Sequence, residues 1–232
     1  MTTPFTKTTP QVLAIIPAKS ISKRIPGKNL KQLAGKPMLA YILETARRVK
    51  GLDRIIVSTE SEEIKKVAEQ YGAEVPFIRP RELTQDDTTT QEVVSHAIDW
   101  LEKNEGGLPD YVLVLYPTSP LLRVERIEEA ISLVLKRNSD ALFSGCYDKG
   151  HYWILGKDGR YDRFYPKESK NSQYQVPLVV ENGAISITRT SLVRAPQSRV
   201  DTADVLIMEQ NENIDVDYPE DFAKVEEILL KQ

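Results

Sequence analysis

Four cationic side chains lie within ten positions of one another near the start of the chain: Lys19, Lys23, Arg24 and Lys28. They follow the apolar run VLAII, in the segment IIPAKSISKRIPGKNL at residues 15–30. Reaction at a triphosphate requires cations on its oxygens, and fixed lysines and the N–H groups of a tight loop supply them. The segment has neither G-x-x-x-x-G-K-[ST] nor G-x-G-x-x-G. On charge alone, a solvated basic loop is the alternative.

A second candidate is the pair Asp215 and Asp217 near the C-terminus. In an extended segment, residues i and i+2 point to the same face, so both carboxylates are aimed at one hard cation. Waters and a substrate phosphate complete the coordination of such a cation. The alternative is an acidic turn before a helix that starts near Pro219, because helix starts favour acidic residues in any case.

The elements that must position these side chains follow from an alternation of apolar runs with amphipathic segments. Strands are expected at 12–16, 54–59, 74–78, 111–116 and 140–146, with two more inside 181–193 and 203–210. Helices are expected from Pro37, over 61–72, over about 88–103, around 127–134 and from near Pro219. This order predicts an α/β fold, a three-layer sandwich with a mostly parallel, Rossmann-like nucleotide-binding sheet.

Ligands of such folds bind at the carboxyl ends of the strands. Polar segments follow four of the expected strands, at 17–29, 58–61, 79–91 and 116–120. One edge of the sheet is therefore expected to gather the residues that could do chemistry.

Composition bounds the class of protein. The 232 residues are 41% hydrophobic and 28% charged, with a net charge of −3. These values are typical of a soluble globular protein and argue against nucleic-acid binding by bulk electrostatics. No apolar run reaches about 18 residues, so no membrane span is expected. The single cysteine, Cys146, suits a reducing cytoplasm because no intrachain disulfide can form.

The domain organisation expected from these patterns is simple. Residues 1–10 are polar and threonine-rich and are expected to form a disordered lead-in, and 11–232 a single domain. Within it, 147–178 is expected to be an inserted arm for dimerisation or sugar binding, because it is aromatic and polar and carries the turn signal KDG. His96 and Cys146 are expected to be packing residues.

Six segments in order resemble the acylneuraminate cytidylyltransferases, the CMP-sialic acid synthetase family. They are IIPAKSISKRIPGKNLKQLAGKPMLAYILETA, DRIIVSTESEEI, FIRPRELTQDDTTT, LYPTSPLLR, ENGAISI and IDVDYPEDF. Each motif alone is weak, but their order over residues 12–230 is specific. Tyr116, before Pro-Thr-Ser-Pro, is more similar to the pseudaminic acid branch, since sialic acid enzymes usually have glutamine there.

The resemblance implies a nucleotide-diphospho-sugar transferase type of fold and an Mg²⁺-dependent enzyme in the cytoplasm. Its substrates would be CTP and a nonulosonic acid such as a sialic, pseudaminic or legionaminic acid. It would form a CMP-sugar and release pyrophosphate. The resemblance also implies a homodimer whose arm reaches the neighbouring subunit's site, so that Gln173 acts in trans. For the general base, Asp217 or a metal-bound water is the best candidate.

The resemblance assigns site residues one by one. The catalytic residues would be Lys19, Lys28 and Asp217, and the metal ligands Asp215 and Asp217. Nucleotide binding would fall to Ala18, Lys19, Ser22, Lys23, Lys28, Asn29, Arg79 and Thr90, with Arg79 and Thr90 lining a cytosine pocket. Substrate binding would fall to Tyr116, Thr118, Ser119, Gln173, Glu181 and Asn182.

Three positions depart from the family pattern. Ile21 replaces a glycine, and a β-branched residue does not readily adopt a positive φ. Lys19 replaces an arginine, which exchanges a bidentate fork for a point charge. Asn171 stands where pseudaminic relatives have an arginine before Ser-Gln, so the identity of the sugar is the least determined feature.

Other functions remain as alternatives. Enzymes that activate an octulosonic acid (Kdo) carry a Gln-Gly-Asp segment after the central strand, which LYPTSPLL lacks. A glycosyltransferase normally has its Asp-x-Asp after a middle strand. The non-enzyme alternative is a nucleotide-binding regulator without turnover, against which Lys28 and the pair Asp215 and Asp217 argue.

Overall fold

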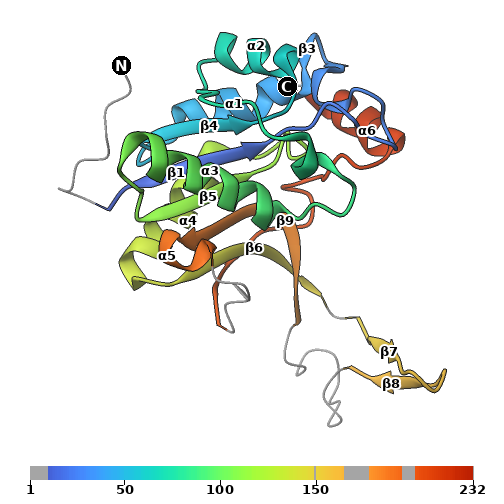
Figure 1. Ribbon diagram of the computed structural model, residues 1–232. Coiled ribbons are helices and arrows are strands. Elements are labelled where there is room, and N and C mark those ends of the chain that lie inside the picture. Colours follow the sequence, from blue (N-terminus) through green and yellow to red (C-terminus); the bar gives the residue numbers. More distant parts are fainter. Residues whose placement is uncertain (1–9, 149, 165–177, 195–201, 232) are drawn as a thin grey trace.

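A six-stranded sheet of order β10-β6-β9-β5-β1-β4 forms the centre of the computed structural model, which describes residues 10–148, 150–164, 178–194 and 202–231 (Figure 1). β1 pairs in parallel with β4 and β5, and β10 with β6, whereas β9 runs antiparallel to β5 and β6. The expected mostly parallel sheet is confirmed. The strands are β1 (Val12–Pro17), β4 (Arg54–Ser58), β5 (Tyr111–Leu115), β6 (Ala141–Asp148), β9 (Leu178–Arg189) and β10 (Asp204–Ile207).

The helices follow the expected amphipathic segments, with the addition of a short α5. They are α1 (Met38–Arg48), α2 (Glu62–Gln70), α3 (Thr90–Glu105), α4 (Val124–Arg137), α5 (Thr190–Val193) and α6 (Pro219–Leu229). Two 3-10 helices, η1 (Lys28–Leu30) and η2 (Arg81–Thr84), lie in loops. Two small antiparallel ribbons complete the fold, β2 (Gln32–Leu33) with β3 (Lys36–Pro37), and β7 (Trp153–Leu155) with β8 (Tyr161–Arg163).

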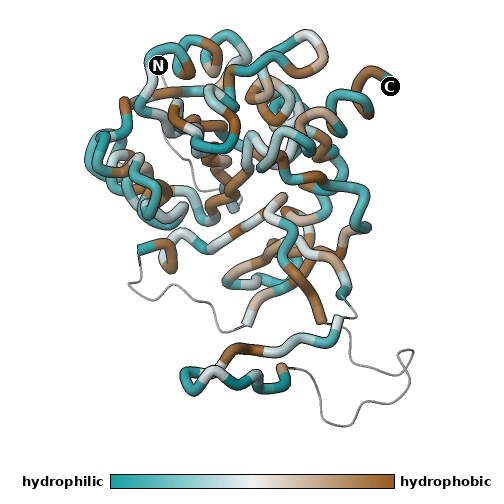
Figure 2. The backbone as a smooth tube through the Cα atoms, turned by 90° about the vertical axis from the view of Figure 1, so that its right-hand side faces the viewer, coloured by the Kyte–Doolittle hydropathy of each residue, from teal (hydrophilic) through white to brown (hydrophobic). Residues whose placement is uncertain are grey.

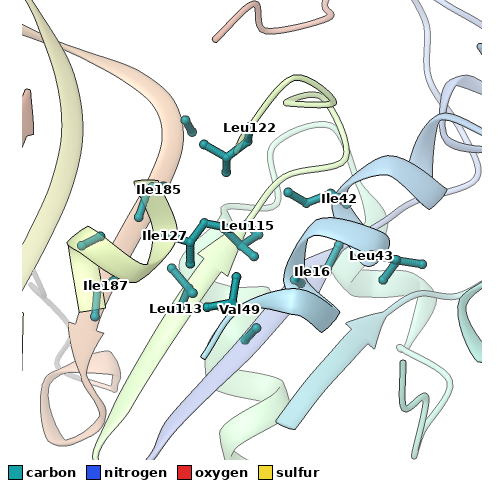
Figure 3. Packing of buried hydrophobic residues seen from close by; sticks show 14 of the residues in the cluster. Ile16, Ile42, Leu43, Val49, Leu113, Leu115, Leu122, Ile127, Ile185 and Ile187 are labelled. Carbon is teal, nitrogen blue, oxygen red and sulfur yellow. The ribbon is translucent and has the colours of Figure 1, made fainter. Parts of the chain in front are cut away.

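The two faces of the sheet are covered by different helices because alternate strand residues point to opposite faces. On one face, Ile16, Leu113 and Leu115 pack with residues of α1 and α4 (Figure 3), and residues of α2 belong to the same cluster. On the other face, Leu13 and Val112 pack with α3 and with Val193 of α5. The result is the three-layer sandwich that the sequence predicts, and a fold in which β1 is buried on both faces.

A third, smaller hydrophobic cluster lies beside the sheet and joins the two ends of the chain. It contains Ile25, Leu33, Met38, Val216, Phe222 and Val225. Ile25 belongs to the segment after β1, and Val216 lies between the two aspartates of the Asp-x-Asp pair. Their shared cluster therefore brings the cationic segment and the acidic pair together.

The expected strand at 74–78 is wrong. Glu74 makes one isolated bridge with Ile56, and the chain then leaves the sheet. Pro76 lacks the N–H that a ladder requires, so pairing cannot continue. Phe77 is nevertheless buried, which explains why the segment is apolar.

The expected hairpin at KDG is confirmed as the β7–β8 ribbon, which stands away from the sheet (Figure 1). Trp153, Ile154 and Leu155 are more than half exposed there, and Figure 2 shows the apolar stretch on this ribbon. Of the lead-in at 1–10, residues 1–9 lie outside the described residues. No described helix is long and apolar enough to cross a membrane.

The third cluster generates a stability prediction. Phe222 is 6% exposed, and replacing it by alanine should lower the free energy of unfolding by about 3–5 kcal/mol, because a buried ring is lost. Urea unfolding followed by circular dichroism measures this. The control is Leu230→Ala, just after α6, where a side chain that is 72% exposed should matter by less than about 0.5 kcal/mol. Equal losses in the two variants would contradict the packing described here.

Candidate functional site

The cationic segment forms a loop at the carboxyl end of β1, which we call the phosphate loop (residues 18–31). It starts with buried Ala18, whose N–H donates to the Ser58 carbonyl of neighbouring β4 (3.0 Å). Ile21 is 69% exposed, and it is not among the non-glycine residues with positive φ in the described chain. The loop takes its left-handed residue at Gly27 instead (φ 63°), at the start of η1. A β-branched residue at position 21 is therefore accommodated without strain.

Lys28 connects this loop to the Asp-x-Asp segment. Its side chain is 13% exposed, and Nζ donates to the Val216 carbonyl (2.8 Å) and to Asp217 Oδ1 (3.2 Å). Arg24 donates from Nη1 to the other oxygen of Asp217 (2.5 Å). Partial burial alone would raise the pKa of Asp217, but the hydrogen bonds and charges of Lys28 and Arg24 lower it below its usual value. Asp217 is therefore a carboxylate held between two cations.

Asp215 lies in a different environment on the same segment. Val216 between the two aspartates is fully buried, and its N–H donates to the Thr118 carbonyl (2.8 Å). Desolvation, and then the charge of Asp217, outweigh a hydrogen bond from Thr118 and raise the pKa of Asp215. Gly183, with a φ of 66°, is close enough that an added Cβ would lie 3.9 Å from Asp215 Oδ2. The two carboxylates thus lie on either side of a buried residue, and their expected direction toward one cation stays a prediction.

These two aspartates are carboxylates of the kind that magnesium takes, and the metal site stays a prediction. In the described parts of the chain, no group of three or more histidine, cysteine or acidic side chains could hold a metal. The charge of Asp217 contributes to the raised pKa of Asp215. Magnesium commonly takes one or two carboxylates from a protein and completes its shell with phosphate and water.

A pocket of about 190 Å³ opens beside the loop. It brings together four residues that the sequence singles out, namely Lys19, Arg79, Thr90 and Tyr116. The remaining lining residues are Pro17, Leu83, Thr84, Gln85, Thr88 and Val93. A planar ring with polar edges would fit such a mixture of apolar and donor groups.

Two acids beside this pocket were missed by the sequence reasoning. Glu60, directly after β4, accepts from the Ser20 N–H and hydroxyl and from Arg79 Nη2. Asp86 forms ion pairs with Lys19 (3.7 Å) and Lys23. Both acids lie in segments recognised as strand-end loops, 58–61 and 79–91. That placement is the only signal that could have identified them.

Other expected nucleotide ligands are engaged within the loop. Asn29 is 8% exposed, and its Nδ2 donates to the Lys19 carbonyl (2.8 Å). The Ser22 hydroxyl accepts from the Ile25 N–H at 3.5 Å. Both side chains therefore shape the loop, and their contacts to a nucleotide stay predictions.

The expected sugar-side residues follow β5 or lie in the first half of β9. Because β9 is antiparallel, Glu181 and Asn182 reach the edge where β1, β4 and β5 end. Burial raises the pKa of Tyr116, and its hydroxyl donates to Thr90 Oγ1 (3.4 Å). Ser119 is fully buried. Gln173 lies outside the described residues.

Asn182 has internal partners. Its Oδ1 accepts from the Ser144 hydroxyl (2.6 Å) and the Ala184 N–H (3.3 Å). Its Nδ2 lies 3.5 Å from the sulfur of Met208. These contacts fix the start of β9, and substrate binding by Asn182 stays a prediction.

The remaining packing expectations can be placed as well. His96 stacks edge-on against Phe77 with ring centroids 4.9 Å apart, and burial lowers its pKa. Cys146 is partly buried against the main core. Both residues have the packing environment expected from the sequence.

Comparisons with known proteins agree with this arrangement. The sequence model of a family described as "Cytidylyltransferase" matches residues 13–182. CMP-N,N'-diacetyllegionaminic acid synthase of Legionella pneumophila is 32% identical over 94% of this chain and 96% of its own length. A pseudaminic acid cytidylyltransferase of Campylobacter jejuni is 38% identical over 57% of this chain and 56% of its own.

Solved structures show the same fold. CMP:2-keto-3-deoxy-manno-octonic acid synthetase complexed with CTP has a TM-score of 0.71 at 16% identity, over 95% of this chain and 99% of that one. 4-Diphosphocytidyl-2C-methyl-D-erythritol synthase from Anaerococcus prevotii has a TM-score of 0.68 at 18% identity, with the same coverage of both chains. The resemblance stated from the six motifs is confirmed, and the chain belongs to the cytidylyltransferase family.

Proposed function

We propose that this chain transfers the CMP group of CTP to a nonulosonic acid and releases pyrophosphate. The observation that carries the proposal is the meeting of the phosphate loop with the Asp-x-Asp segment through Lys28, at 2.8 Å and 3.2 Å. A triphosphate needs cations for its oxygens and carboxylates for its metal ion. Both kinds of group are present here, because Lys28 is in direct contact with Asp217.

The nucleotide would lie between this loop and the pocket described above. Lys19 and Lys28 would neutralise the triphosphate oxygens, and Asn29 would contact the ribose or a phosphate. The cytosine would occupy the pocket of about 190 Å³, where Arg79 and Thr90 offer donors to its O2 and N3 acceptors.

The reaction would be an in-line displacement at the α-phosphorus. The anomeric oxygen of the sugar acid forms a bond to this phosphorus, and the bond to the bridging oxygen of pyrophosphate breaks. The hydroxyl proton passes to a carboxylate or to water. Asp215 and Asp217 would hold a magnesium ion, which when bound neutralises phosphate charge and makes the attacking hydroxyl more acidic.

The acceptor is assigned through the relatives. A protein aligned with 94% of this chain is named as a legionaminic acid synthase, and another aligned with 57% as a pseudaminic acid enzyme. The Kdo synthetase shares only 16% identity, so its likeness supports the fold and no particular sugar. A nonulosonic acid is therefore favoured over the octulosonic alternative.

We also propose that the enzyme is a homodimer that works in the cytoplasm. Among the described residues of 147–178, several apolar side chains are exposed, including Tyr147, Ile154, Leu155 and Tyr161. A patch of this kind on a projecting ribbon favours contact with a second copy. Gln173 of one copy would then serve the site of the other.

Pyrophosphate release tests the reaction. With CTP, Mg²⁺ and a panel of sialic, pseudaminic, legionaminic and octulosonic acids, we expect release with CTP and a nonulosonic acid. ATP, GTP and UTP should give far less, and chelation of magnesium should stop the reaction. The proposal fails if CTP yields no pyrophosphate with any acid of the panel.

Asp217→Asn tests the metal role. We expect kcat/KM to fall at least 100-fold and the magnesium concentration for half-maximal rate to rise, because one carboxylate is lost while the side chain keeps its size. The unfolding midpoint should fall somewhat, because asparagine loses the ion pairs to Lys28 and Arg24, but the variant should stay folded because Lys28 keeps its hydrogen bond to the Val216 carbonyl. Glu220→Gln, an exposed acid three positions further on, is the matched control. Near-normal turnover in Asp217→Asn would refute the assignment.

Sedimentation tests the arm. The wild type should sediment as a dimer, and the double variant Ile154→Asp/Leu155→Asp should weaken dimerisation by at least tenfold. Burial of one such apolar side chain contributes about 1.5–3 kcal/mol, and 1.4 kcal/mol corresponds to tenfold. Lys157→Ser, in the turn of the same ribbon, should leave the dimer intact. An unchanged dimer in the double variant would exclude this ribbon from the interface.

A further inference from the structure

Glu60 holds an unusual position between two parts of the candidate site. Its Oε1 accepts from both the N–H (2.7 Å) and the hydroxyl (2.6 Å) of Ser20 in the phosphate loop. Its Oε2 accepts from Nη2 of Arg79 (3.2 Å) in the pocket wall. One oxygen of the carboxylate therefore binds Ser20, which lies 40 residues earlier in the sequence, and the other binds Arg79, which lies 19 residues later.

The surroundings of Glu60 make these contacts consequential. Its side chain is 10% exposed and that of Arg79 is 2% exposed, so water screens the pair weakly. Burial alone would raise the pKa of Glu60, but the hydrogen bonds from Ser20 and the charge of Arg79 hold it below its usual value. Glu60 is therefore a buried carboxylate whose charge is balanced by Arg79.

Arg79 retains unused donor capacity. Its Nε is buried and has no hydrogen-bond partner among the described residues, although Nη2 is bound to Glu60 and the backbone N–H to Thr59 (2.8 Å). A buried donor without a partner is unfavourable, and the contacts of Arg79 with the described residues leave part of its guanidinium unused. Glu60 helps to fix the orientation of this guanidinium group, because it accepts the hydrogen bond from Nη2.

We propose that Glu60 is a positioning residue that sets the phosphate loop and the base pocket at a fixed distance from each other. This inference rests on the proposed function. Lys19 precedes Ser20 in the chain and lines the same pocket as Arg79. By binding both Ser20 and Arg79, Glu60 fixes the position of Lys19, which would contact the triphosphate, relative to Arg79, which would contact the base. Glu60 itself is not among the residues that line the pocket.

Steady-state kinetics of Glu60→Gln test the proposal. Glutamine keeps the size of the side chain but removes the charge and can present an N–H₂ group to Arg79. We expect KM for CTP to rise at least tenfold, with KM for the sugar acid changed less than threefold. The ratio of kcat/KM for CTP to that for UTP should fall at least tenfold, because Arg79 is no longer oriented toward the base. Glu63→Gln, an exposed acid on α2, is the matched control and should behave as wild type.

A merely structural role predicts a different pattern. In that case Glu60→Gln would lower the melting temperature and impair both substrates alike, with the CTP to UTP ratio unchanged. That result, or wild-type kinetics, would overturn the proposal. If Glu60→Gln does not fold, Ser20→Ala decides, because it removes one donor to Glu60 and keeps the N–H. KM for CTP should then rise about threefold, and an unchanged KM for CTP would overturn the proposal.

A double-mutant cycle tests the link to Arg79. The effect of Glu60→Gln on KM for CTP should be at least threefold smaller in an Arg79→Gln background, since one of the two groups it positions is gone. Independent, multiplicative effects would contradict the coupling. Failure of the proposed function is recognised separately, because then the wild type itself would release no pyrophosphate from CTP. Turnover by the wild type with unaffected Glu60 variants would reject this inference alone.

Discussion

The candidate site depends on the hydrogen bonds that the largely buried ammonium group of Lys28 donates to the Asp-x-Asp segment. Its hydrogen bonds connect Lys28 with Val216 and Asp217, which follow it by 188 and 189 positions in the sequence. The nearby residues Ile25 and Val216 bury their side chains in the same small cluster. A hydrogen bond to a charged group contributes about 1.5–3 kcal/mol when it is shielded from water, which is the case at 13% exposure. This contact, the cluster beneath it and the hydrogen bond from the Val216 N–H to the Thr118 carbonyl together hold the Asp-x-Asp segment at the edge of the sheet.

Much of this arrangement could be predicted from local patterns. Apolar alternation located the sheet strands, and helical periodicity located the helices that cover both faces. The rule that ligands bind at the carboxyl ends of strands singled out the segments 17–29, 79–91 and 116–120, and residues of all three line the pocket. These features succeed because they depend on the geometry of one short segment, which the sequence carries directly.

The rest depends on contacts between distant segments, which periodicity does not encode. The direction of β9 cannot be predicted from its residues, although it decides where Glu181 lies. The segment 74–78 has a strand's composition, yet Pro76 ends its pairing after one bridge. Glu60 was missed because a single acid after a strand is common, and only its two partners in space distinguish it. Asn29 and Asn182 illustrate the converse, since polar residues in a motif also form internal hydrogen bonds.

The antiparallel course of β9 has a consequence for how selectivity is encoded. The pocket and the phosphate loop are built from residues 17–93 together with Tyr116, whereas the residues expected to meet the sugar begin at Tyr116 and continue into β9. Under the proposed function, the contacts to the base precede Tyr116 and the contacts to the sugar follow it, while the Asp-x-Asp pair reaches the site from the C-terminal part of the chain. If the proposed roles hold, a change of acceptor would require exchanges mainly between Tyr116 and Asn182, and the contacts to the base would stay in place.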